Sequence, residues 1–582
     1  MAKSCLNSEF IIELKERLER WKNSVLKERF KGTIEPRFRT GGGTVQTKEI
    51  KQEFRTGSGD LVVRPVYTPL DLADCNWDEI GLPGEFPYTR GRDPVGFRAF
   101  KWPLSFYSGY GSSKNANERY RSLYAAGARH IYLALDLPTQ IGLDSDHPLA
   151  LGEVGKVGVA IDSISDLEAV MEGLPLDMIH TGSLFNCTGP WGLAMYIVLA
   201  ERKGYGLGDL RIHMQNDPIK EYTGRGTYIF SPDIAIDLSS DVVEYICKHL
   251  PQWEPQYHCT TTLRWGGCSA SQEIAFGIAN LISYVEAAKG KGVPPGEYMP
   301  RINLHMTADN DLFEEVAKFR ATRRLWAKIA RERFTTEDPR VLGLRISVYT
   351  AAYKLTAQEP MNNIIRTTMH VLASMLGGVE EIAVPAHDEA LALPTFESTR
   401  LANLTKHLLF EECNIGNTAD PLGGSYFIES LTDDIEKAAL EEYEKVEKLG
   451  GAMAAINDGY YLQKMAGGMY RYMKEVENNE RNIIGLNKFS LDKEIPIELF
   501  KNDPETEQRQ KDKLNDTRRR RNGNDVSEAL KELRRVAEKK ASGFQENIVP
   551  AMISAVRSEA TVGEIFGVLR DVFGEYKPPA II

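Results

Sequence analysis

The sequence predicts an α/β protein whose main domain is a (β/α)8 TIM barrel, with an N-terminal extended arm and a helical C-terminal region. Eight short runs rich in Val, Ile, Leu and Tyr recur along its middle, and stretches of helical period lie between them. This alternation is typical of a parallel sheet covered by helices, and eight such units fit the barrel in number and size. The expected strands are 104–110, 130–137, 178–184, 210–215, 257–264, 301–306, 344–350 and 380–385, and the expected helices include 114–126, 189–202, 233–250, 270–289, 309–333 and 357–376.

Periodicity and composition divide the chain into five segments. An amphipathic helix over 8–30 precedes a region rich in Gly, Pro and Thr, including Gly41 to Gly43, which favours an extended arm. Strand signals end after residue 420, and helical periods follow. The expected boundaries are 1–95 for helix and arm, 96–420 for the barrel, 421–499 for helices packed on it, 500–523 for a charged linker and 524–582 for a C-terminal helical segment.

Composition excludes several classes of protein. The net charge of −11 argues against nucleic-acid binding, which requires a basic surface; the exception, Arg518 to Arg521, is interpreted as a solvated linker tract or a partner contact. No apolar run is long enough to cross a membrane, and the N-terminus does not resemble a signal peptide. The seven cysteines are scattered without a Cys-x-x-Cys pair, so we expect a cytoplasmic protein without structural zinc.

The stretch 213–230 is the strongest candidate for a site. It leaves the apolar run Leu210 to Met214 and passes directly into Gln215, Asn216 and Asp217, with Arg225 ten residues beyond Gln215. Working groups of a barrel enzyme lie at the carboxyl ends of its strands, where a guanidinium can hold a substrate carboxylate. The alternative is a buried hydrogen-bond network, with Arg225 paired to Asp217 or Glu221.

Other strand ends carry weaker signals. Tyr107 precedes a glycine turn, which indicates either a core tyrosine or a ligand-facing ring. The loop 135–148 contains three acids and a histidine, and is either a capped structural turn or a site wall. Neither a phosphate-binding P-loop nor a dinucleotide-binding glycine motif is present.

Histidines on the expected strands raise the alternative of a metal-dependent hydrolase. Neither an H-x-H nor an H-E-x-x-H motif accompanies them, and a core histidine is the commoner outcome, so no metal site is predicted. The histidines concerned are His180, His213, His258 and His305.

Several motifs together resemble the catalytic chain of methylmalonyl-CoA mutases, in order over about residues 60–480. They are Tyr107-Ser-Gly-Tyr110, Asp136-Leu-Pro-Thr139, Asp144-Ser-Asp-His-Pro148, Gly158-Val-Ala-Ile-Asp-Ser163, Gln215-Asn-Asp217 with Arg225, Leu325-Trp-Ala327, Leu355-Thr-Ala-Gln358, Asp388-Glu-Ala390 and Asp420-Pro-Leu-Gly-Gly-Ser425. The resemblance implies an adenosylcobalamin-dependent isomerase that moves a thioester group by radical chemistry. It also implies a barrel threaded by the pantetheine arm of coenzyme A.

The resemblance assigns roles to matching positions. Tyr107 matches a tyrosine between substrate and cofactor, Gln215 a hydrogen-bonding glutamine, and Arg225 the arginine that binds the free carboxylate. Arg301 matches a coenzyme A contact and Glu389 a glutamate at the adenosyl ribose. The full expected set is Tyr107, Gln215 and Arg225 as catalytic residues; these three with Leu135, Thr181, Thr261, Thr262, Arg301 and Asn303 as substrate-binding residues; and Gln140 with Glu389 as cofactor-binding residues.

Departures from the family pattern indicate a different acyl group. Thr261 and Thr262 replace a Tyr-His pair, Leu135 replaces a phenylalanine, Gln140 a histidine and Pro385 an asparagine. Loss of these rings enlarges a pocket that a native core would otherwise fill. We therefore expect a dicarboxylic acyl-CoA bulkier than methylmalonyl-CoA, for example an alkylsuccinyl-CoA. The alternatives are methylmalonyl-CoA itself, or a hydroxyisobutyryl-CoA or isobutyryl-CoA type substrate.

The cobalamin itself is expected on another chain. The motif D-x-H-x-x-G is absent, and the sequence ends about where a cobalamin domain would begin, so a separate small subunit is expected to bind most of the adenosylcobalamin. A dimer of heterodimers is a further expectation, with the N-terminal arm and residues 524–572 as docking surfaces. A non-catalytic scaffold is the remaining alternative, and retention of Tyr107, Gln215, Arg225 and Glu389 argues against it.

Overall fold

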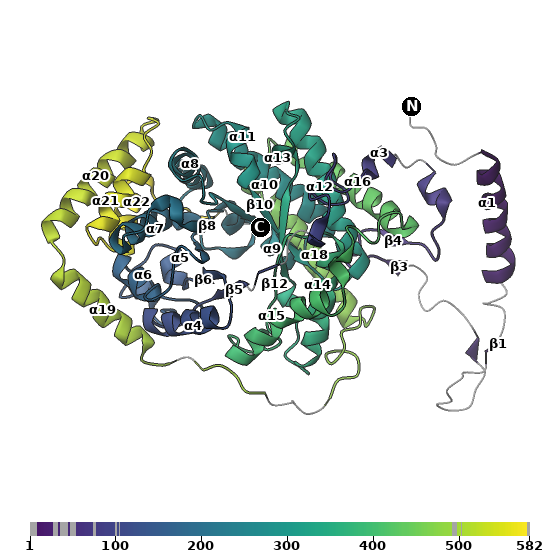
Figure 1. The fold of residues 1–582 in the computed structure, drawn as a ribbon, viewed down its shortest axis with the longest axis horizontal. Helices are drawn as coiled ribbons and strands as arrows, with labels where there is room; N and C mark the ends of the chain where they lie inside the picture. The colour runs from purple at the N-terminus through teal and green to yellow at the C-terminus, as the bar shows by residue number, and fades with distance from the viewer. Residues whose placement is uncertain are drawn as a thin grey trace.

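The computed structural model contains eight parallel strands arranged as two four-stranded sheets (Figure 1). It describes residues 8–26, 33–34, 45–46, 54–73, 77–98, 102–103, 105–491, 497–501 and 503–578. One sheet has the order β5-β6-β7-β8 and the other β12-β11-β10-β9. The strands are β5 (Ser105–Ser108), β6 (His130–Leu133), β7 (His180–Leu184), β8 (Arg211–Gln215), β9 (Tyr257–Cys259), β10 (Asn303–Ala308), β11 (Arg345–Thr350) and β12 (Glu381–Ala383).

The edges of the two sheets lie close together at both sides. At one side, Glu254 donates its backbone N–H to Ile212 of β8 at 2.8 Å and accepts one from Met214 at 3.1 Å. At the other side, the buried Lys406 ammonium donates to Ser105 Oγ of β5 at 3.0 Å and to the Ile382 carbonyl of β12 at 3.2 Å. The ladder hydrogen bonds of the described residues define two four-stranded half-sheets. They do not by themselves show the single closed barrel that the sequence predicts.

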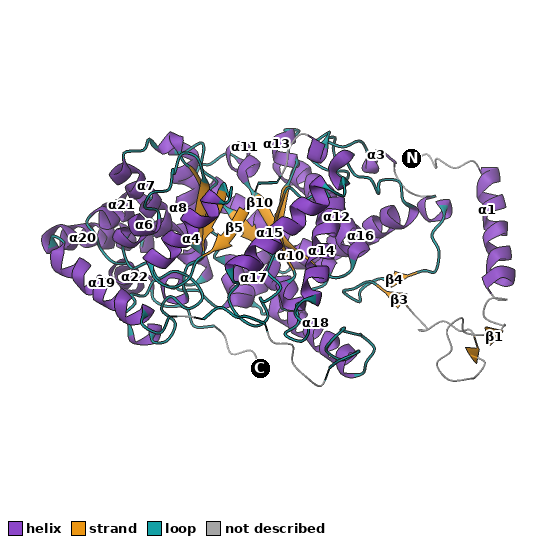
Figure 2. Cartoon of the chain, turned by 60° about the horizontal axis from the view of Figure 1, so that its bottom comes forward, coloured by secondary structure: helices purple, strands orange, loops and turns teal. Residues whose placement is uncertain are grey.

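Helices surround the strands, as Figure 2 shows by colour. The helices between and after the strands are α4 (Ser113–Ala125), α5 (Leu137–Gln140), α6 (Ile164–Val170), α7 (Gly189–Lys203), α8 (Pro232–His249), α9 (Thr261–Trp265), α10 (Ala270–Gly290), α11 (Pro295–Tyr298), α12 (Leu312–Phe334), α13 (Pro339–Leu342), α14 (Asn362–Leu376), α15 (Phe396–Glu411), α16 (Tyr426–Lys448), α17 (Ala452–Asn457), α18 (Tyr460–Glu477), α19 (Thr506–Arg520), α20 (Gly523–Ala541), α21 (Val549–Arg557) and α22 (Val562–Phe573). None of the described helices is long and apolar enough to span a bilayer.

Each half-sheet has its own hydrophobic core. The core of β5–β8 extends through α7 to the C-terminal helices α20–α22, whereas the core of β9–β12 is completed by α10, α12 and α16. Helix α7 is buried along its length from Gly189 to Ala200, because α21 packs on it as well as the sheet. A helix that is apolar on all sides needs cover on all sides, so the C-terminal helices are an integral part of this half.

The N-terminal segments differ in how much of them the structure describes. The helix predicted over 8–30 is present as α1 (Ser8–Arg20), which continues as a π-helical turn over Trp21–Leu26. Gly41 to Gly43 of the predicted arm lie outside the described residues. The described part of the arm contains the short pair β3 (Phe54–Arg55) and β4 (Val62–Val63), and contacts α12 where Gly57 N–H donates to Asp311 at 2.8 Å.

Two features differ from the sequence expectation. Residues 500–523, expected as a linker, contain α19, whose Leu514 is buried and whose Gln510 donates to Asp162 at 2.8 Å. Because most residues of this segment are polar or charged, its composition did not reveal the one buried face of α19. The fifth strand was expected to run to residue 264 but ends at Cys259, because Thr260 to Trp265 turn into α9.

Candidate active site

A cavity of about 570 Å3 opens at the carboxyl ends of the strands, between the two sheets. It is lined by six of the residues expected from the sequence, namely Tyr107, Gln215, Arg225, Thr261, Thr262 and Glu389. These residues come from β5, β8, the segments after β8 and β9, and the segment after β12. The fold therefore brings together side chains that are up to 282 residues apart (389 − 107).

Arg225 lies at the end of a π-helical turn over Glu221–Arg225 that directly follows β8. Its Nη1 lies 3.4 Å from the fully buried carboxylate of Glu221, which confirms one of the two ion pairs weighed for it. Glu221 also accepts from Asn186 Nδ2 at 2.7 Å and lies 3.7 Å from the Lys220 ammonium. Glu221 thus has partners besides Arg225. The ion pair positions Arg225, and 27% of the Arg225 side chain remains accessible in the cavity.

Gln215 lines the cavity beside this cationic cluster. Its Oε1 accepts from Lys220 Nζ at 3.3 Å, which fixes the amide orientation and leaves the amide NH2 to face the cavity. Asn216 and Asp217 serve the fold instead. Asp217 accepts from Tyr284 Oη and from Cys259 N–H, both at 2.7 Å, and Asn216 Nδ2 donates to the Ser239 carbonyl at 2.9 Å. The polar stretch after β8 thus contains both a site residue and a structural network.

Tyr107 and Glu389 lie on the opposite wall. Tyr107 keeps 42% of its surface accessible from the cavity, and the surrounding protein raises its pKa to about 12 although Arg225 opposes the shift. Burial raises the pKa of Glu389 to about 7, and Tyr349 Oη donates to its carboxylate at 3.4 Å. Near neutral pH the Tyr107 hydroxyl is a hydrogen-bond donor, and Glu389 exists in both protonation states.

Thr261 and Thr262 begin α9 at the third wall. Thr261 Oγ1 lies 2.9 Å from Cys259 Sγ, whereas the buried Thr262 Oγ1 has no hydrogen-bond partner. Buried hydroxyls are normally satisfied, so an orphaned hydroxyl in a cavity lining is suited to a ligand oxygen.

Five residues of the expected set lie outside this cavity lining. Leu135 is 1% exposed in the core, and Gln140 donates to its carbonyl at 2.6 Å. Thr181 is 1% exposed, on a strand position that alternates with the inward Gly182. Arg301 and Asn303 lie at the opposite, amino-terminal end of β10. The loop that contains Leu135 is a capped structural turn at Asp136, whose carboxylate accepts from Thr139 N–H at 3.0 Å.

The floor of the cavity consists of residues outside the set expected at the site, although His213 and His305 were weighed as metal ligands. Tyr132, His213, Tyr257, His305 and Glu381 project from β6, β8, β9, β10 and β12 into the space between the sheets. We call these five residues the floor layer. Four of them stand at polar positions next to an apolar residue on their strand, whereas Tyr257 lies between Gln256 and His258. For those four, the alternation was the signal available in the sequence.

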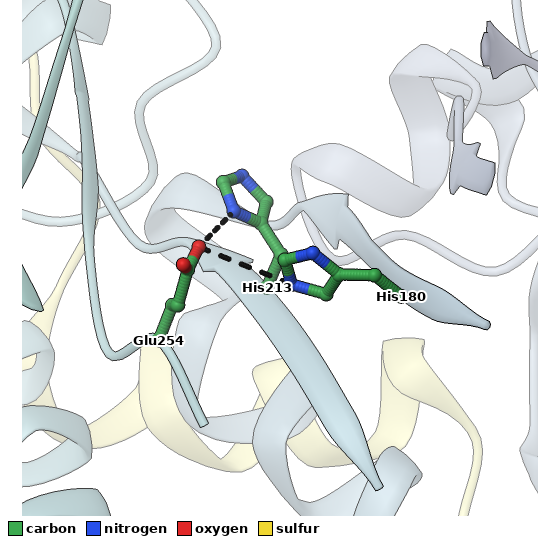
Figure 3. A group of neighbouring side chains, drawn as sticks. All are labelled: His180, His213 and Glu254. Carbon is green, nitrogen blue, oxygen red and sulfur yellow. Dashed lines mark hydrogen bonds and ion pairs between the residues drawn. The ribbon is translucent and has the colours of Figure 1, made fainter. Parts of the chain in front are cut away.

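His213 of the floor layer and the neighbouring His180 both point toward Glu254 (Figure 3). His213 Nδ1 lies 3.0 Å and His180 Nε2 3.9 Å from Glu254 Oε2, and the ligand atoms of the three lie within 4.8 Å of one another. Arg345 donates to Glu254 Oε1 at 2.6 Å, so the carboxylate already has a counter-charge. Burial lowers the pKa of His180 to about 4 and keeps it neutral. The expectation that no metal binds stays a prediction, although two of the four strand histidines do meet a carboxylate here.

Comparisons with known proteins show the family of the chain. The family model for methylmalonyl-CoA mutase matches residues 56–575. The chain belongs to the methylmalonyl-CoA mutase family. It is 36% identical to the 2-hydroxyisobutanoyl-CoA mutase large subunit of Aquincola tertiaricarbonis, over 91% of this chain and 93% of that protein.

Other relatives have the mutase activity that gives the family its name. The chain is 35% identical to the methylmalonyl-CoA mutase of Escherichia coli K12, over 89% of this chain and 72% of that protein. It is 34% identical to the methylmalonyl-CoA mutase large subunit of Streptomyces virginiae, over 92% of this chain and 75% of that protein. Mutases are isomerases, so the enzyme class predicted from the sequence is confirmed, and the family is in general cobalamin-dependent.

Proposed function

We propose that this chain is the large subunit of an adenosylcobalamin-dependent mutase that rearranges the carbon skeleton of a substrate bearing a free carboxylate. The observation that carries the proposal is Arg225, held at the cavity wall by Glu221 with 27% of its side chain accessible. A guanidinium binds a carboxylate with two parallel hydrogen bonds and fixes its orientation. Gln215 and Tyr107, which line the same cavity, add neutral donors.

The residues at the cavity mouth fit the expected cofactor in part. Glu389, with a pKa raised to about 7 by burial, offers a carboxyl group to a ribose hydroxyl, and the Tyr107 ring offers a flat face. Gln140, the other residue expected at the cofactor, is instead bonded to the Leu135 carbonyl. When bound, adenosylcobalamin would supply an organic radical that removes a substrate hydrogen. The chain's own residues would hold the substrate, exclude water and keep the phenol of Tyr107 protonated.

The sequence expectation of a bulky dicarboxylic acyl group is compatible with this cavity. The small side chains of Thr261 and Thr262 line it, and the unpartnered Thr262 hydroxyl supplies a site for an oxygen of that group. An alkylsuccinyl unit anchored at Arg225 is the acyl group that we propose. A 2-hydroxyisobutanoyl group, named in one relative, has no free carboxylate and would leave Arg225 without a substrate anion to bind.

We further propose that the two half-sheets form one (β/α)8 barrel and that cobalamin is carried mainly by a separate small subunit. Two relatives are named large subunits, which supports a partner chain. The C-terminal helices α20–α22 are packed into the core of the first half, so we assign them a structural role and place the partner at the cavity mouth.

The test is an activity screen of the full chain with adenosylcobalamin and a cobalamin-binding small subunit. Substrates would include dicarboxylic acyl groups of increasing size and isobutyryl-CoA as the monocarboxylic control. We expect turnover only with a substrate that has a free carboxylate, and loss of that turnover in Arg225→Met. Efficient turnover of isobutyryl-CoA would refute the role of Arg225.

A further inference from the structure

The cavity wall contains a gap in its side-chain lining where two glycines lie close together. Gly224 belongs to the turn over Glu221–Arg225, and Gly266 directly follows α9; both line the cavity, and the turn is in contact with α9. Neither glycine has a side chain to cover the space beside it. We call this part of the wall, between Gly224 and Gly266, the glycine seam.

The methyl group of Met465 fills the glycine seam from the side of α18. A Cβ placed on Gly224 would lie 3.0 Å from Met465 Cε, and a Cβ placed on Gly266 would lie 2.0 Å from the same atom. One methyl group thus occupies the side-chain space of both glycines. Met465 is buried, with 6% of its surface exposed, and it follows the last strand of the sheets by more than one helix.

Helix α18 is held firmly against the wall. A Cβ on Gly267 would lie 2.4 Å from the Met465 carbonyl oxygen, and a Cβ on Gly468 would lie 1.9 Å from the Gly267 carbonyl oxygen, so the two backbones touch. At the start of the helix, the Tyr461 ring stacks on Phe276 with 3.9 Å between the ring centroids. Methionine has an unbranched, flexible side chain, so the Met465 methyl can move while the helix stays in place.

The floor layer, in contrast, is fixed by its own contacts. Tyr257 Oη lies 2.7 Å from His305 Nδ1. The rings of Tyr132 and His213 lie 5.0 Å apart, and Gly182 of β7, in register with both residues, places no side chain between them. A ligand group that pushed into this layer would break contacts among buried polar groups, which is costly. A bulky acyl group therefore finds room more readily at the glycine seam than at the floor.

The glycine seam lies directly beside the proposed carboxylate anchor. Gly224 precedes Arg225 in the chain, and a Cβ on Gly224 would lie 3.5 Å from Thr262 Cβ. The unpartnered hydroxyl of Thr262 is thus part of the same neighbourhood. A dicarboxylic acyl group bound at Arg225 places the carbon atoms next to its carboxylate close to the seam.

We propose that Met465 determines which acyl substituents the enzyme accepts. The inference rests on the proposed mutase function and names the place where the bulky part of its acyl group is bound. A long alkyl substituent enters the glycine seam and displaces the Met465 methyl, whereas a methyl substituent leaves it in place. One methylene in an apolar pocket changes kcat/KM by about 10- to 200-fold, so one adaptable side chain is sufficient to set the preferred substituent.

The test compares two substrates with the complete enzyme, that is, the full chain with adenosylcobalamin and the small subunit. The quantity measured is the ratio of kcat/KM for butylsuccinyl-CoA to kcat/KM for methylsuccinyl-CoA. In Met465→Ala the seam is open before the substrate binds, so the ratio should rise by at least about tenfold. The control Met473→Ala, at an exposed position of the same helix, should leave the ratio as in wild type. An unchanged ratio in Met465→Ala would overturn the proposal.

Two further variants test whether the seam itself causes the change. Gly266→Ala adds a methyl group 2.0 Å from the position of Met465 Cε, and this group has room once residue 465 is alanine. The double variant Gly266→Ala with Met465→Ala should therefore lose most of the gain in the ratio, and a ratio that stays raised would overturn the proposal. Met465→Leu keeps the side-chain volume and thus the fold, but its branched end is less free to leave the seam. Its ratio should fall below that of wild type, and a ratio at or above the wild-type value would count against the proposal.

Arg225→Met distinguishes failure of this inference from failure of the proposed function. If turnover of both substrates depends on Arg225 while the Met465 variants leave the ratio unchanged, the mutase proposal stands and only this inference falls. Turnover that is indifferent to Arg225, or a wild-type enzyme that converts no dicarboxylic acyl-CoA, would overturn the proposed function and this inference with it.

Discussion

Replacement of Arg225 by methionine isolates the carboxylate anchor with little cost to the fold. The guanidinium lies 3.4 Å from Glu221, but that carboxylate keeps the hydrogen bond from Asn186 at 2.7 Å and the ammonium of Lys220 at 3.7 Å. Glu221 is therefore not left as an unpaired buried charge, which would itself be strongly destabilising. Methionine also matches the length of the arginine stem, so the cavity wall keeps its packing.

The size of the effect follows from the hydrogen bonds that the substitution removes. A guanidinium gives a carboxylate two hydrogen bonds, each worth at least about 1.5 kcal/mol when charged groups are involved, hence about 3 kcal/mol in total. At about 1.4 kcal/mol per tenfold, kcat/KM should fall by about 100-fold or more. The assay compares kcat/KM and thermal unfolding of wild type, Arg225→Met and the surface control Arg340→Met, whose side chain is 71% exposed. A loss below about tenfold with unchanged unfolding would refute the anchor.

Three further predictions concern protonation, packing and metal. Because burial raises the pKa of Glu389 from 4.5 to about 7, the unfolded chain binds fewer protons than the folded chain between these pH values, and the free energy of unfolding falls as pH rises through them. In urea denaturation from pH 4 to 8, the stability of Glu389→Gln relative to wild type should increase by up to about 3 kcal/mol. Curves of stability against pH that stay parallel for the two proteins would contradict this. Gly182→Ala places a Cβ 1.8 Å from a backbone carbonyl of β8 and should destabilise by about 3 kcal/mol or more, whereas Gly208→Ala, with no atom within 4 Å, should change stability by less than about 0.5 kcal/mol in the same assay. Since Arg345 already neutralises Glu254, we expect metal analysis to find no stoichiometric zinc and a chelator to leave thermal unfolding unchanged; a bound equivalent would refute this.

The strands were predictable because their side chains alternate or are uniformly apolar. All eight expected strands are present, and most differ from expectation by one to four residues at their ends. The fifth strand was predicted too long because Thr260 to Thr262 have high β propensity, although they form the start of α9. Helix α19 was missed because its mean composition is that of a solvated tract; only Thr506, Gln510, Leu514 and Thr517 are buried, at helical spacing.

The site was predictable only in part, because the sequence shows which residues follow a strand end but not which of them face the cavity. Position after a strand end was sufficient to locate Gln215 and Arg225 at the cavity. The same criterion also selected Asn216, the neighbour of Gln215, whose side chain instead donates to the Ser239 carbonyl. Arg301 stands at the amino-terminal end of β10 and Arg225 follows the carboxyl end of β8, so their assignment to one long ligand stays a prediction.

Membership of the family fixes the architecture more firmly than it fixes the ligand. The proposed carboxylate anchor at Arg225 depends on a local turn, Glu221–Arg225, and a different substrate could be bound there without altering the sheets. The floor layer, in contrast, depends on one residue from each of five strands and on Gly182, which allows two of the rings to meet. Replacement of Gly182 by any larger residue would place a Cβ 1.8 Å from the His213 carbonyl oxygen and force β7 and β8 apart, so this set of rings is tied to the architecture and not to one ligand.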